Sequence, residues 1–336
     1  MTNLDPFNEP FGSIFSDNYS ISYYSNESYS YEGHSTKLEN FSVHPGAHGI
    51  HYSSNCFEGL KAHRQIDGSV AIFRLDDHVN RMRQSLTSLQ VKPPEFDLLK
   101  KMILDAVASN VEDTPQSPGS LYIRPAFFGT LENVGAAATP TTTGSLYVLN
   151  SPVGDYFKGG IRPLSLFVEE SLARTTAQFG MVKGGANYAL ALGPTLRAKA
   201  EYGVDQVLFA NNNDVTETGA ANFFLVDDNK LITRHLDTSF LHGITRDSII
   251  QIANDSGFKV EERTITVEEL SEWNSEAFLS GTAAVIAPVG SVIIKGETHS
   301  FGDGQPGSNT LKLRNALTDI QIGKSEDKYG WLTKVS

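Results

Sequence analysis

Short strand-like and helical segments alternate irregularly along this chain, and this order limits the possible fold more than any other feature. Strand-like runs at residues 59–63 and 70–73 flank a glycine turn. Helical apolar spacing then continues to Pro93 and Pro94, with Asp76 and Asp77 as expected caps. No regular βαβ series recurs, so we expect mixed α/β or α+β sheets, not a doubly wound parallel sheet. The other expected strands are residues 41–43, 121–128, 145–149, 206–210, 222–226, 230–233 and 277–279, and the other expected helices are residues 97–109 and 187–202.

The chain of 336 residues exceeds the usual size of one hydrophobic core, which predicts two domains. Proline and glycine interrupt the apolar periodicity at residues 151–160, where we place the linker. The predicted order is an N-terminal arm at 1–40, a small α/β domain at 41–150, that linker, and a larger domain at 161–336. The arm is rich in Ser, Tyr and Asn, so it is either a flexible segment or an aromatic-rich strand packed onto the core.

The charge balance argues against two classes of partner. A formal net charge of −12 argues against nucleic acid or an anionic membrane as the main partner, because both attract a basic surface. A local basic pocket for a small anion is compatible with this total. Cys56 is the only cysteine, which excludes an intrachain disulfide and any Cys-x-x-Cys pair and fits a reducing compartment.

Targeting signals are also judged from composition. The apolar run at residues 283–294 is too short to span a membrane and contains Pro288 and Gly290. Through residue 36 the chain carries acidic residues but no Lys or Arg, unlike a secretory signal or an Arg-rich transit peptide. We therefore expect a cytoplasmic protein.

One lysine has the local sequence of a reactive amine. Lys183 lies between Met181-Val182 and Gly184-Gly185, and Tyr188 follows. An amine that is desolvated on one side and accessible on the other suits Schiff-base formation with a carbonyl cofactor. Most lysines before a Gly-Gly turn are ordinary solvated loop residues, so this segment needs support from its neighbours.

Four other positions along the chain carry residues that could bind a ligand. Glu217 precedes small residues that let a flat ligand approach closely. Ile244 and Thr245 open a helix whose N–H groups suit a phosphate, although Thr245 is otherwise simply a helix cap. The segment at residues 280–284 follows an apolar strand and offers a hydroxyl and amides to an anion. Arg81 either reaches a phosphate or is a solvated surface charge.

Three histidines, His44, His48 and His51, are spaced like metal ligands. The Pro-Gly and Gly-Ile pairs between them oppose a helical presentation, and no carboxylate or cysteine nearby completes a ligand set, so we predict no metal site. The chain also lacks a P-loop, a strand-linked Gly-x-Gly-x-x-Gly and a Gly-x-Ser-x-Gly elbow. Nucleotide-binding and serine-hydrolase functions therefore have no motif in this sequence.

Taken in order, these segments resemble the branched-chain amino acid aminotransferases, which are fold type IV pyridoxal-phosphate enzymes. The resemblance extends from about His51 to the C-terminus and implies a small N-terminal α/β domain, a larger C-terminal pseudo-barrel domain and a homodimer. The motifs that carry it are His51-Tyr52-Ser53-Ser54-Asn55-Cys56-Phe57-Glu58-Gly59-Leu60, Leu121-Tyr122-Ile123-Arg124-Pro125, the lysine segment, Glu217 to Asn222, Gly243-Ile244-Thr245-Arg246 and Ser280 to Ala284.

The resemblance also implies residue roles and pyridoxal 5'-phosphate as the cofactor. Lys183 is similar to the Schiff-base lysine, Tyr188 to the tyrosine on the ring oxygen, and Glu217 to the carboxylate on the pyridine nitrogen. The remaining implied contacts are Arg81, the amides of Ile244 and Thr245, and Thr282 for the phosphate; Tyr52, Phe57, Tyr122 and Tyr156 for the aromatic walls; the amides of Ala283 and Ala284 for the α-carboxylate; and Arg124 for the side-chain carboxylate of glutamate.

The implied reaction is ping-pong amino transfer between L-leucine, L-isoleucine or L-valine and 2-oxoglutarate. D-amino acid aminotransferases, (R)-selective amine aminotransferases and aminodeoxychorismate lyase share the lysine, the glutamate and the phosphate contacts, while residues 122–124 and 151–156 favour the branched-chain group. A non-catalytic binding protein and a histidine-dependent metal protein are the alternatives of another class. Ala284 and Ala287 stand where some animal members carry Cys-x-x-Cys, so we expect no thiol switching.

Overall fold

The computed structural model describes residues 5–156 and 160–335, which form two compact units. The first unit contains the described residues up to Tyr156, together with Val182–Gly185 and the segment from Ile320 onward. The second unit contains residues 160–181 and Ala186–Asp319. The lysine segment and the C-terminal segment therefore group with the first unit, although both follow the expected linker at residues 151–160 in the chain.

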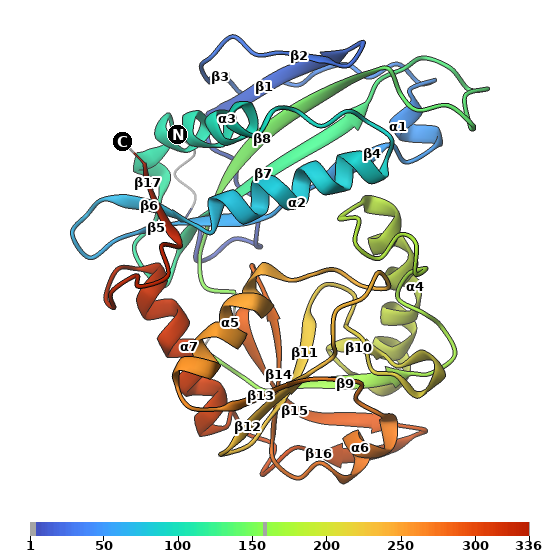
Figure 1. Ribbon diagram of the computed structural model, residues 1–336, viewed down its shortest axis with the longest axis vertical. Coiled ribbons are helices and arrows are strands. Elements are labelled where there is room, and N and C mark those ends of the chain that lie inside the picture. The colour runs from blue at the N-terminus through green and yellow to red at the C-terminus, as the bar shows by residue number, and fades with distance from the viewer. Residues whose placement is uncertain (1–4, 157–159, 336) are drawn as a thin grey trace. The chain divides into compact units, whose positions relative to one another are not determined.

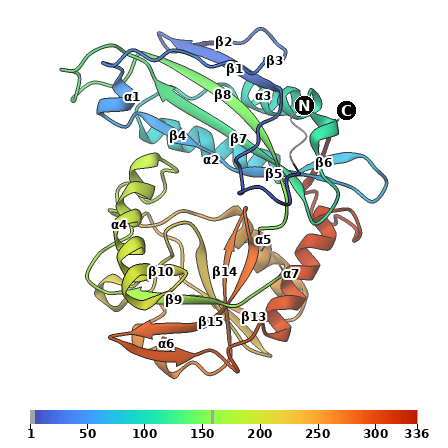
Figure 2. The same cartoon turned by 180° about the vertical axis from the view of Figure 1, so that it is seen from behind.

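A nine-stranded sheet forms the first unit, in the order β17-β6-β5-β7-β8-β1-β2, with β3 on β1 and β4 on β7 (Figure 1). All of its pairings are antiparallel. Helices α2 and α3 lie side by side over one face of this sheet (Figures 1 and 2). The elements are β1 (Asn18–Ser25), β2 (Ser28–Ser30), β3 (Thr36–Lys37), α1 (His48–His51), β4 (Asn55–Phe57), β5 (Leu60–Arg64), β6 (Val70–Phe73), α2 (Leu75–Ser88), α3 (Phe96–Ala108), a 3-10 turn (Val111–Asp113), β7 (Ser120–Gly129), β8 (Thr143–Val153) and β17 (Leu332–Val335).

The N-terminal arm contains a strand that packs onto the core, which is one of the two alternatives that its composition left open. β1 pairs with β8 over six residues, from Ser20 opposite Val148 to Ser25 opposite Thr143. Tyr24 is buried in the core of the unit, where its ring lies 5.9 Å from that of Phe127. The strand expected at residues 41–43 does not form, and β3 pairs with β1 a few residues earlier.

The start of α2 differs from the expectation. We expected Asp76 or Asp77 to cap the helix, but Arg74 is the N-cap, in the left-handed conformation with φ of 54°, and no side chain caps it. Both aspartates lie in the first turn, where the helix dipole favours negative charge. The C-terminal segment fixes this helix start, since the Arg74 N–H donates to the Trp331 carbonyl oxygen at 2.7 Å.

An eight-stranded mixed sheet forms the second unit, in the order β10-β9-β15-β14-β11-β12-β13, with β16 on β15. Its pairs β10/β9, β15/β9 and β12/β13 are parallel and the others antiparallel, which confirms mixed sheets and excludes a doubly wound arrangement. The elements are β9 (Leu164–Glu169), α4 (Gly185–Tyr202), β10 (Gln206–Phe209), a 3-10 turn (Asn211–Asn213), β11 (Asn222–Val226), β12 (Lys230–Thr233), α5 (Ile244–Asp255), β13 (Lys259–Glu262), α6 (Val267–Glu272), β14 (Glu276–Gly281), β15 (Val285–Ile294), β16 (Glu297–Ser300) and α7 (Ser308–Gln321).

Buried aromatic side chains hold this second sheet. Phe224 on β11 stacks on Phe278 of β14, with ring centroids 4.8 Å apart, and both are fully buried. Burial of each such ring stabilises the fold by about 2 to 3 kcal/mol. Helix α4 contains Pro194 and is followed by Gly203 at φ of 69°, the left-handed conformation in which glycine commonly terminates a helix.

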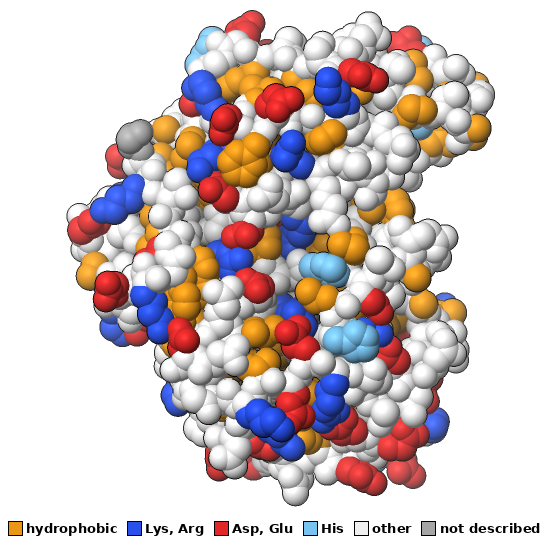
Figure 3. Space-filling model, in the orientation of Figure 1, with side chains coloured by type: hydrophobic (Ala, Val, Ile, Leu, Met, Phe, Trp, Pro, Cys, Tyr) orange, Lys and Arg blue, Asp and Glu red, His pale blue; other side chains and the backbone are white. Residues whose placement is uncertain are grey.

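Acidic and basic side chains are intermingled over the face shown in Figure 3. Among the described residues, none of the helices has the length and apolar character needed to cross a bilayer.

Candidate active site

Lys183 is held on the first unit by hydrogen bonds of its loop. Its backbone N–H donates to Ser85 Oγ on α2 at 3.1 Å, and its carbonyl oxygen accepts from the Phe57 N–H at 2.9 Å. Gly185 N–H donates to Asn55 Oδ1 at 3.2 Å. Lys183 Nζ lies 5.3 Å from the centroid of the Phe57 ring. The amine is therefore placed beside an aromatic face, on a loop that is fixed from both sides.

Arg81 is a buried residue of α2, not a solvated surface charge. Its Nε and Nη2 donate to the two carboxylate oxygens of Glu58, at 2.6 and 2.9 Å. His78, one turn earlier on α2, lies with Nδ1 2.8 Å from Glu58 Oε2. Burial lowers the pKa of His78 below its usual value, against the opposing effect of Glu58. The imidazole is therefore neutral and donates its Nδ1–H to the carboxylate.

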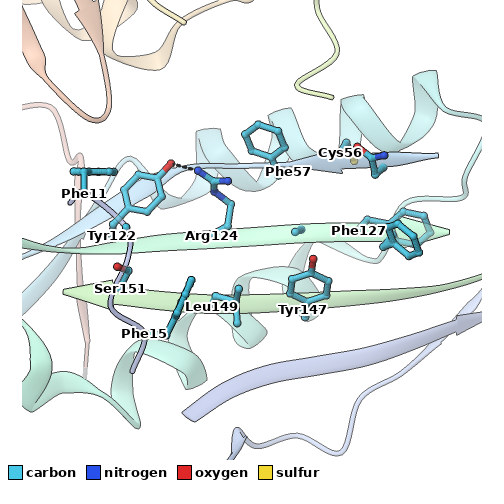
Figure 4. A pocket seen from close by; sticks show the side chains of 14 residues that line it. Phe11, Phe15, Cys56, Phe57, Tyr122, Arg124, Phe127, Tyr147, Leu149 and Ser151 are labelled. Atoms are coloured by element: carbon cyan, nitrogen blue, oxygen red, sulfur yellow. Dashed lines mark hydrogen bonds between the residues drawn. The ribbon is translucent and has the colours of Figure 1, made fainter. Parts of the chain in front are cut away.

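An aromatic cavity of 440 Å³ opens on the first unit beside Phe57 (Figure 4). Arg124 extends from β7 between Tyr122 and Phe57, and its Nη2 donates to the Tyr122 hydroxyl at 2.9 Å. The guanidinium carbon lies 4.5 Å from the Phe57 ring centroid. The cavity thus combines apolar walls with one fixed cation. Its other lining residues are Phe11, Gly12, Phe15, Asn55, Cys56, Ala126, Phe127, Phe128, Tyr147, Leu149 and Ser151.

Two of the aromatic residues assigned to the substrate walls have other neighbours. Tyr52 donates its hydroxyl hydrogen to the carbonyl oxygen of Val134. The ring of Tyr156 lies 6.0 Å from that of Phe11, and Phe11 in turn lies 5.0 Å from Tyr122. The structure therefore brings Phe57, Tyr122 and Arg124 together around one cavity, and places Tyr156 at its edge through Phe11.

In the second unit a buried acid and a buried arginine meet beside Tyr188. Arg174 Nε lies 3.8 Å from Glu217 Oε1, and both side chains are almost fully buried. The guanidinium also donates to the Gly219 carbonyl oxygen, at 3.1 Å from Nε and 2.9 Å from Nη2. Its Cζ lies 5.2 Å from the Tyr188 ring centroid. Arg174 therefore links the carboxylate, the Gly219 turn and the tyrosine.

The N-terminus of α5 presents main-chain donors. Gly243 is the N-cap, and no side chain caps the helix, so Thr245 does not have the capping role that was one alternative for it. Ile244 and Thr245 form the first turn, whose N–H groups have no acceptor within the helix. A side chain at Gly243 would place Cβ 2.0 Å from Asn222 Oδ1, so the close approach of β11 requires glycine here.

Thr282, Ala283 and Ala284 form the turn between β14 and β15. Gly281 pairs with Val285 across the turn, and Val285 has φ of 62°, a conformation that β-branched residues rarely adopt. The Ala284 carbonyl oxygen accepts from Arg314 Nη1 at 2.6 Å. Arg314 therefore helps to fix this turn.

The predicted residues thus fall into two groups, each built within its own unit. The first unit carries Arg81, Lys183, Tyr52, Phe57, Tyr122, Arg124 and Tyr156, and the second carries Tyr188, Glu217, Ile244, Thr245, Thr282, Ala283 and Ala284. Sequence reasoning missed Glu58, Arg174 and Phe11. Arg174 and Phe11 lie outside helices and strands and had no periodic signal. Glu58 lies within the motif at residues 51–60, and no role of its own followed from the sequence.

The three spaced histidines bind main-chain atoms separately. His48 Nε2 lies 3.1 Å from the carbonyl oxygens of Ala136 and Thr139, and His51 Nε2 lies 2.9 Å from that of Pro45. His48 and His51 belong to the one-turn helix α1, contrary to the expectation that Gly-Ile prevents helix there. No metal-ligand cluster of three or more His, Cys, Asp or Glu side chains occurs within residues 5–156 and 160–335.

Residues 55–292 match the family model described as class IV amino-transferase, and the chain therefore belongs to the class IV aminotransferase family. Among its relatives is the chloroplastic branched-chain-amino-acid aminotransferase 5 of Arabidopsis thaliana, 37% identical over 91% of this chain and 74% of that protein. The fold is similar to the branched-chain amino acid aminotransferase of Thermobaculum terrenum in its PLP form, with a TM-score of 0.78 and 26% identity over 96% of this chain and 100% of that one. The branched-chain aminotransferase of Thermoproteus uzoniensis with norvaline gives a TM-score of 0.76 and 27% identity over 94% of this chain and 100% of that one.

These relatives correct the expected compartment. Related aminotransferases of Arabidopsis thaliana and Humulus lupulus are named as chloroplastic. The expectation of a cytoplasmic protein was wrong, because it took an acidic N-terminal composition as a sign of location, and the composition of one segment does not determine the compartment.

Proposed function

We propose that this chain is a branched-chain amino acid aminotransferase that transfers amino groups between L-leucine, L-isoleucine or L-valine and 2-oxoglutarate. The observation that carries the proposal is the cavity lined by Phe57, whose ring centroid lies 5.3 Å from the Lys183 amine and 4.5 Å from the Arg124 guanidinium carbon. Apolar walls suit a branched side chain, and a cation held by Tyr122 suits the second carboxylate of glutamate. One cavity then serves both partners of a ping-pong reaction.

The residues of both units fit pyridoxal 5'-phosphate by their donor chemistry. A lysine amine suits the aldehyde, a buried carboxylate suits the protonated pyridine nitrogen, and uncapped helix amides suit the phosphate. Lys183, Glu217 and the first turn of α5 offer these three kinds of group. When bound, the cofactor supplies an electron sink for the electrons released at the substrate Cα.

We assign the phosphate to Arg81, to the amides of Ile244 and Thr245, and to the Thr282 hydroxyl. Arg81 is supported by its buried, directed guanidinium, and the two amides by their place at a helix N-terminus without a side-chain cap. Tyr188 holds the ring oxygen. Arg174 supports the assignment of Glu217, because a guanidinium 3.8 Å from the carboxylate offsets part of the cost of burying it.

The substrate contacts are assigned in the same way. The Nζ of Lys183 accepts the Cα proton and returns it, while the hydrogen bonds of its loop fix the direction of the amine. Phe57 and Tyr122 line the cavity and exclude water from the side chain. Tyr156 is assigned to the edge of the cavity, and Tyr52 to the aromatic wall by the resemblance alone. The amides of Ala283 and Ala284 bind the α-carboxylate. Arg124 binds the distal carboxylate of glutamate, which the apolar walls alone would reject.

Amino-donor profiling tests this function. Purified protein loaded with pyridoxal phosphate is expected to convert L-leucine and 2-oxoglutarate, and to lose this activity in Lys183→Ala. Turnover of D-alanine or an aryl amine in place of L-leucine would assign the chain to the D-amino acid or (R)-amine enzymes. Release of pyruvate from aminodeoxychorismate without an amino acceptor would assign it to the lyases.

The Arg124 assignment has its own test. Arg124→Met is expected to raise KM for 2-oxoglutarate strongly and KM for L-leucine little, because only the former carries the second carboxylate. Tyr147→Phe, at another position of the same cavity, is the control for a change of wall polarity. Equal effects of Arg124→Met on both substrates contradict the assignment.

The homodimer is a further part of the proposal. Leu190, Leu192 and Leu196 on α4 are each more than half exposed, and Leu192 and Leu196 lie one turn apart on one face of the helix. Exposed apolar faces of this kind mark association sites. Leu192→Lys combined with Leu196→Lys is expected to shift a dimer toward monomer in light scattering, whereas Glu201→Lys on the same helix is not.

A further inference from the structure

Glu58 is a fully buried carboxylate that is surrounded by donors. Oε1 accepts from Arg81 Nε at 2.6 Å, and Oε2 accepts from Arg81 Nη2, His78 Nδ1 and the Gly59 N–H at 2.9, 2.8 and 3.2 Å. The backbone of the residue is also fixed, because the Glu58 N–H donates to the Pro125 carbonyl oxygen at 2.8 Å. The carboxylate therefore occupies one position, set by β4, β7 and α2 together.

The charge state of this cluster follows from its contacts. Burial alone would raise the pKa of the Glu58 carboxyl, but Arg81 and His78 outweigh burial and hold that pKa well below its usual value. Glu58 is then ionised, Arg81 is cationic and His78 is neutral. The cluster as a whole carries no net charge, which reduces the cost of burying it.

The pairing of Glu58 with Arg81 fixes the direction of the guanidinium. A guanidinium is planar, so holding Nε and Nη2 against two oxygens also determines the plane and direction of Nη1. A long arginine side chain without such a partner loses rotamer entropy when it binds an anion. Here that entropy is already lost in the folded protein.

We propose that Glu58 is a positioning residue for cofactor phosphate, acting through Arg81, with His78 holding the carboxylate in place. This inference rests on the proposed function and on the assignment of Arg81 to the phosphate. For a variant with a neutral residue at Glu58, this inference predicts weaker phosphate binding, whereas charge alone predicts stronger phosphate binding. Neutralising Glu58 would leave the positive charge of Arg81 uncompensated, which would strengthen phosphate binding if charge dominated. If orientation dominates, the same change weakens phosphate binding.

The test compares pyridoxal phosphate with pyridoxal, which has the same aldehyde and ring but no phosphate. Apo-protein is titrated with each compound, and binding is followed by the visible absorption band and by the apo-protein's thermal midpoint. In Glu58→Gln, whose amide places a donor against the donors of Arg81 and His78, we expect the Kd for pyridoxal phosphate to rise about 10- to 100-fold. The Kd for pyridoxal is expected to change less than about twofold.

Two further variants separate positioning from general damage. Glu276→Gln makes the same change at a carboxylate that accepts from the Asn309 and Thr310 N–H groups, and it is expected to leave both Kd values unchanged. Arg81→Met is expected to weaken pyridoxal phosphate alone, and adding Glu58→Gln to it is expected to cause little further loss. Should Glu58→Gln fail to fold, His78→Asn, which alters the contact to Oε2, is titrated in its place and is expected to show the same selective loss.

The inference is overturned if Glu58→Gln binds pyridoxal phosphate as tightly as the unaltered protein or more tightly, or if it weakens both compounds equally. It is also overturned if the losses of Glu58→Gln and Arg81→Met add in the double variant. A different result, in which the unaltered protein binds neither compound at Lys183, would reject the proposed function itself.

Discussion

Ser85→Ala is the sharpest single test of how the candidate catalytic amine is held. Ser85 is fully buried on α2, and its hydroxyl oxygen accepts the Lys183 N–H from 98 positions further along the chain. Alanine removes the acceptor with almost no change of volume, so the cost is mainly that of an unsatisfied donor. We expect a loss of about 1 to 2 kcal/mol in the free energy of unfolding.

A second effect is expected at the amine. Small displacements of a reacting group reduce a rate by up to about 100-fold, so Ser85→Ala is expected to lower kcat by about 10-fold or more with little change in KM. Denaturant unfolding measures the first effect and steady-state kinetics the second. Ser88→Ala is the matched control, because Ser88 is an exposed residue of the same helix that donates only to the Gln84 carbonyl oxygen. The reasoning is refuted if both variants behave alike in the two assays.

Three further predictions concern stability. Burial lowers the pKa of His63 to about 3, below the pKa of an unfolded histidine, so the unfolded chain binds the proton first as pH falls. The free energy of unfolding therefore decreases as pH drops below about 6.5, by up to about 1.4 kcal/mol per pH unit. His63→Gln is expected to flatten this slope in denaturant unfolding measured between about pH 7 and 4.5. Arg174→Met leaves the Glu217 carboxylate buried without that guanidinium and is expected to cost about 3 kcal/mol in denaturant unfolding, and a cost below about 1 kcal/mol would contradict the pairing. Gly203→Ala at positive φ is expected to lower the thermal midpoint, whereas Gly193→Ala inside α4, where an added Cβ meets no atom within 4 Å, is expected to raise it.

Local sequence patterns predicted several elements closely. The hairpin of β11 and β12 was predicted at residues 222–226 and 230–233, which are its bounds in the structure. Two short apolar runs on either side of an Asp-Asp-Asn turn specify such a hairpin without help from the rest of the chain. The start of α2 was predicted less well, because Arg74 takes a left-handed conformation that no capping rule anticipates.

The sequence also indicated which residue types carry the chemistry. The lysine before Gly-Gly, the glutamate before small residues and the helix that opens at Ile244 are each visible within a few positions. Their order along the chain carried the resemblance to the branched-chain aminotransferases, and the match to the class IV family confirmed it. Chemical identity is a property of single residues and short segments, so sequence alone determined it.

Only the tertiary structure decided how these residues are held. The lysine loop is held on the first unit by Ser85, which lies 98 positions before Lys183, and by Asn55, which lies 130 positions before Gly185. The residues on both sides of this loop belong to the second unit. Arg81 owes its direction to Glu58, which lies 23 positions earlier in the connection between β4 and β5. Such contacts follow from sheet register and packing between distant segments, and no local periodicity records them, because a hydrogen bond depends on position in space and not on spacing along the chain.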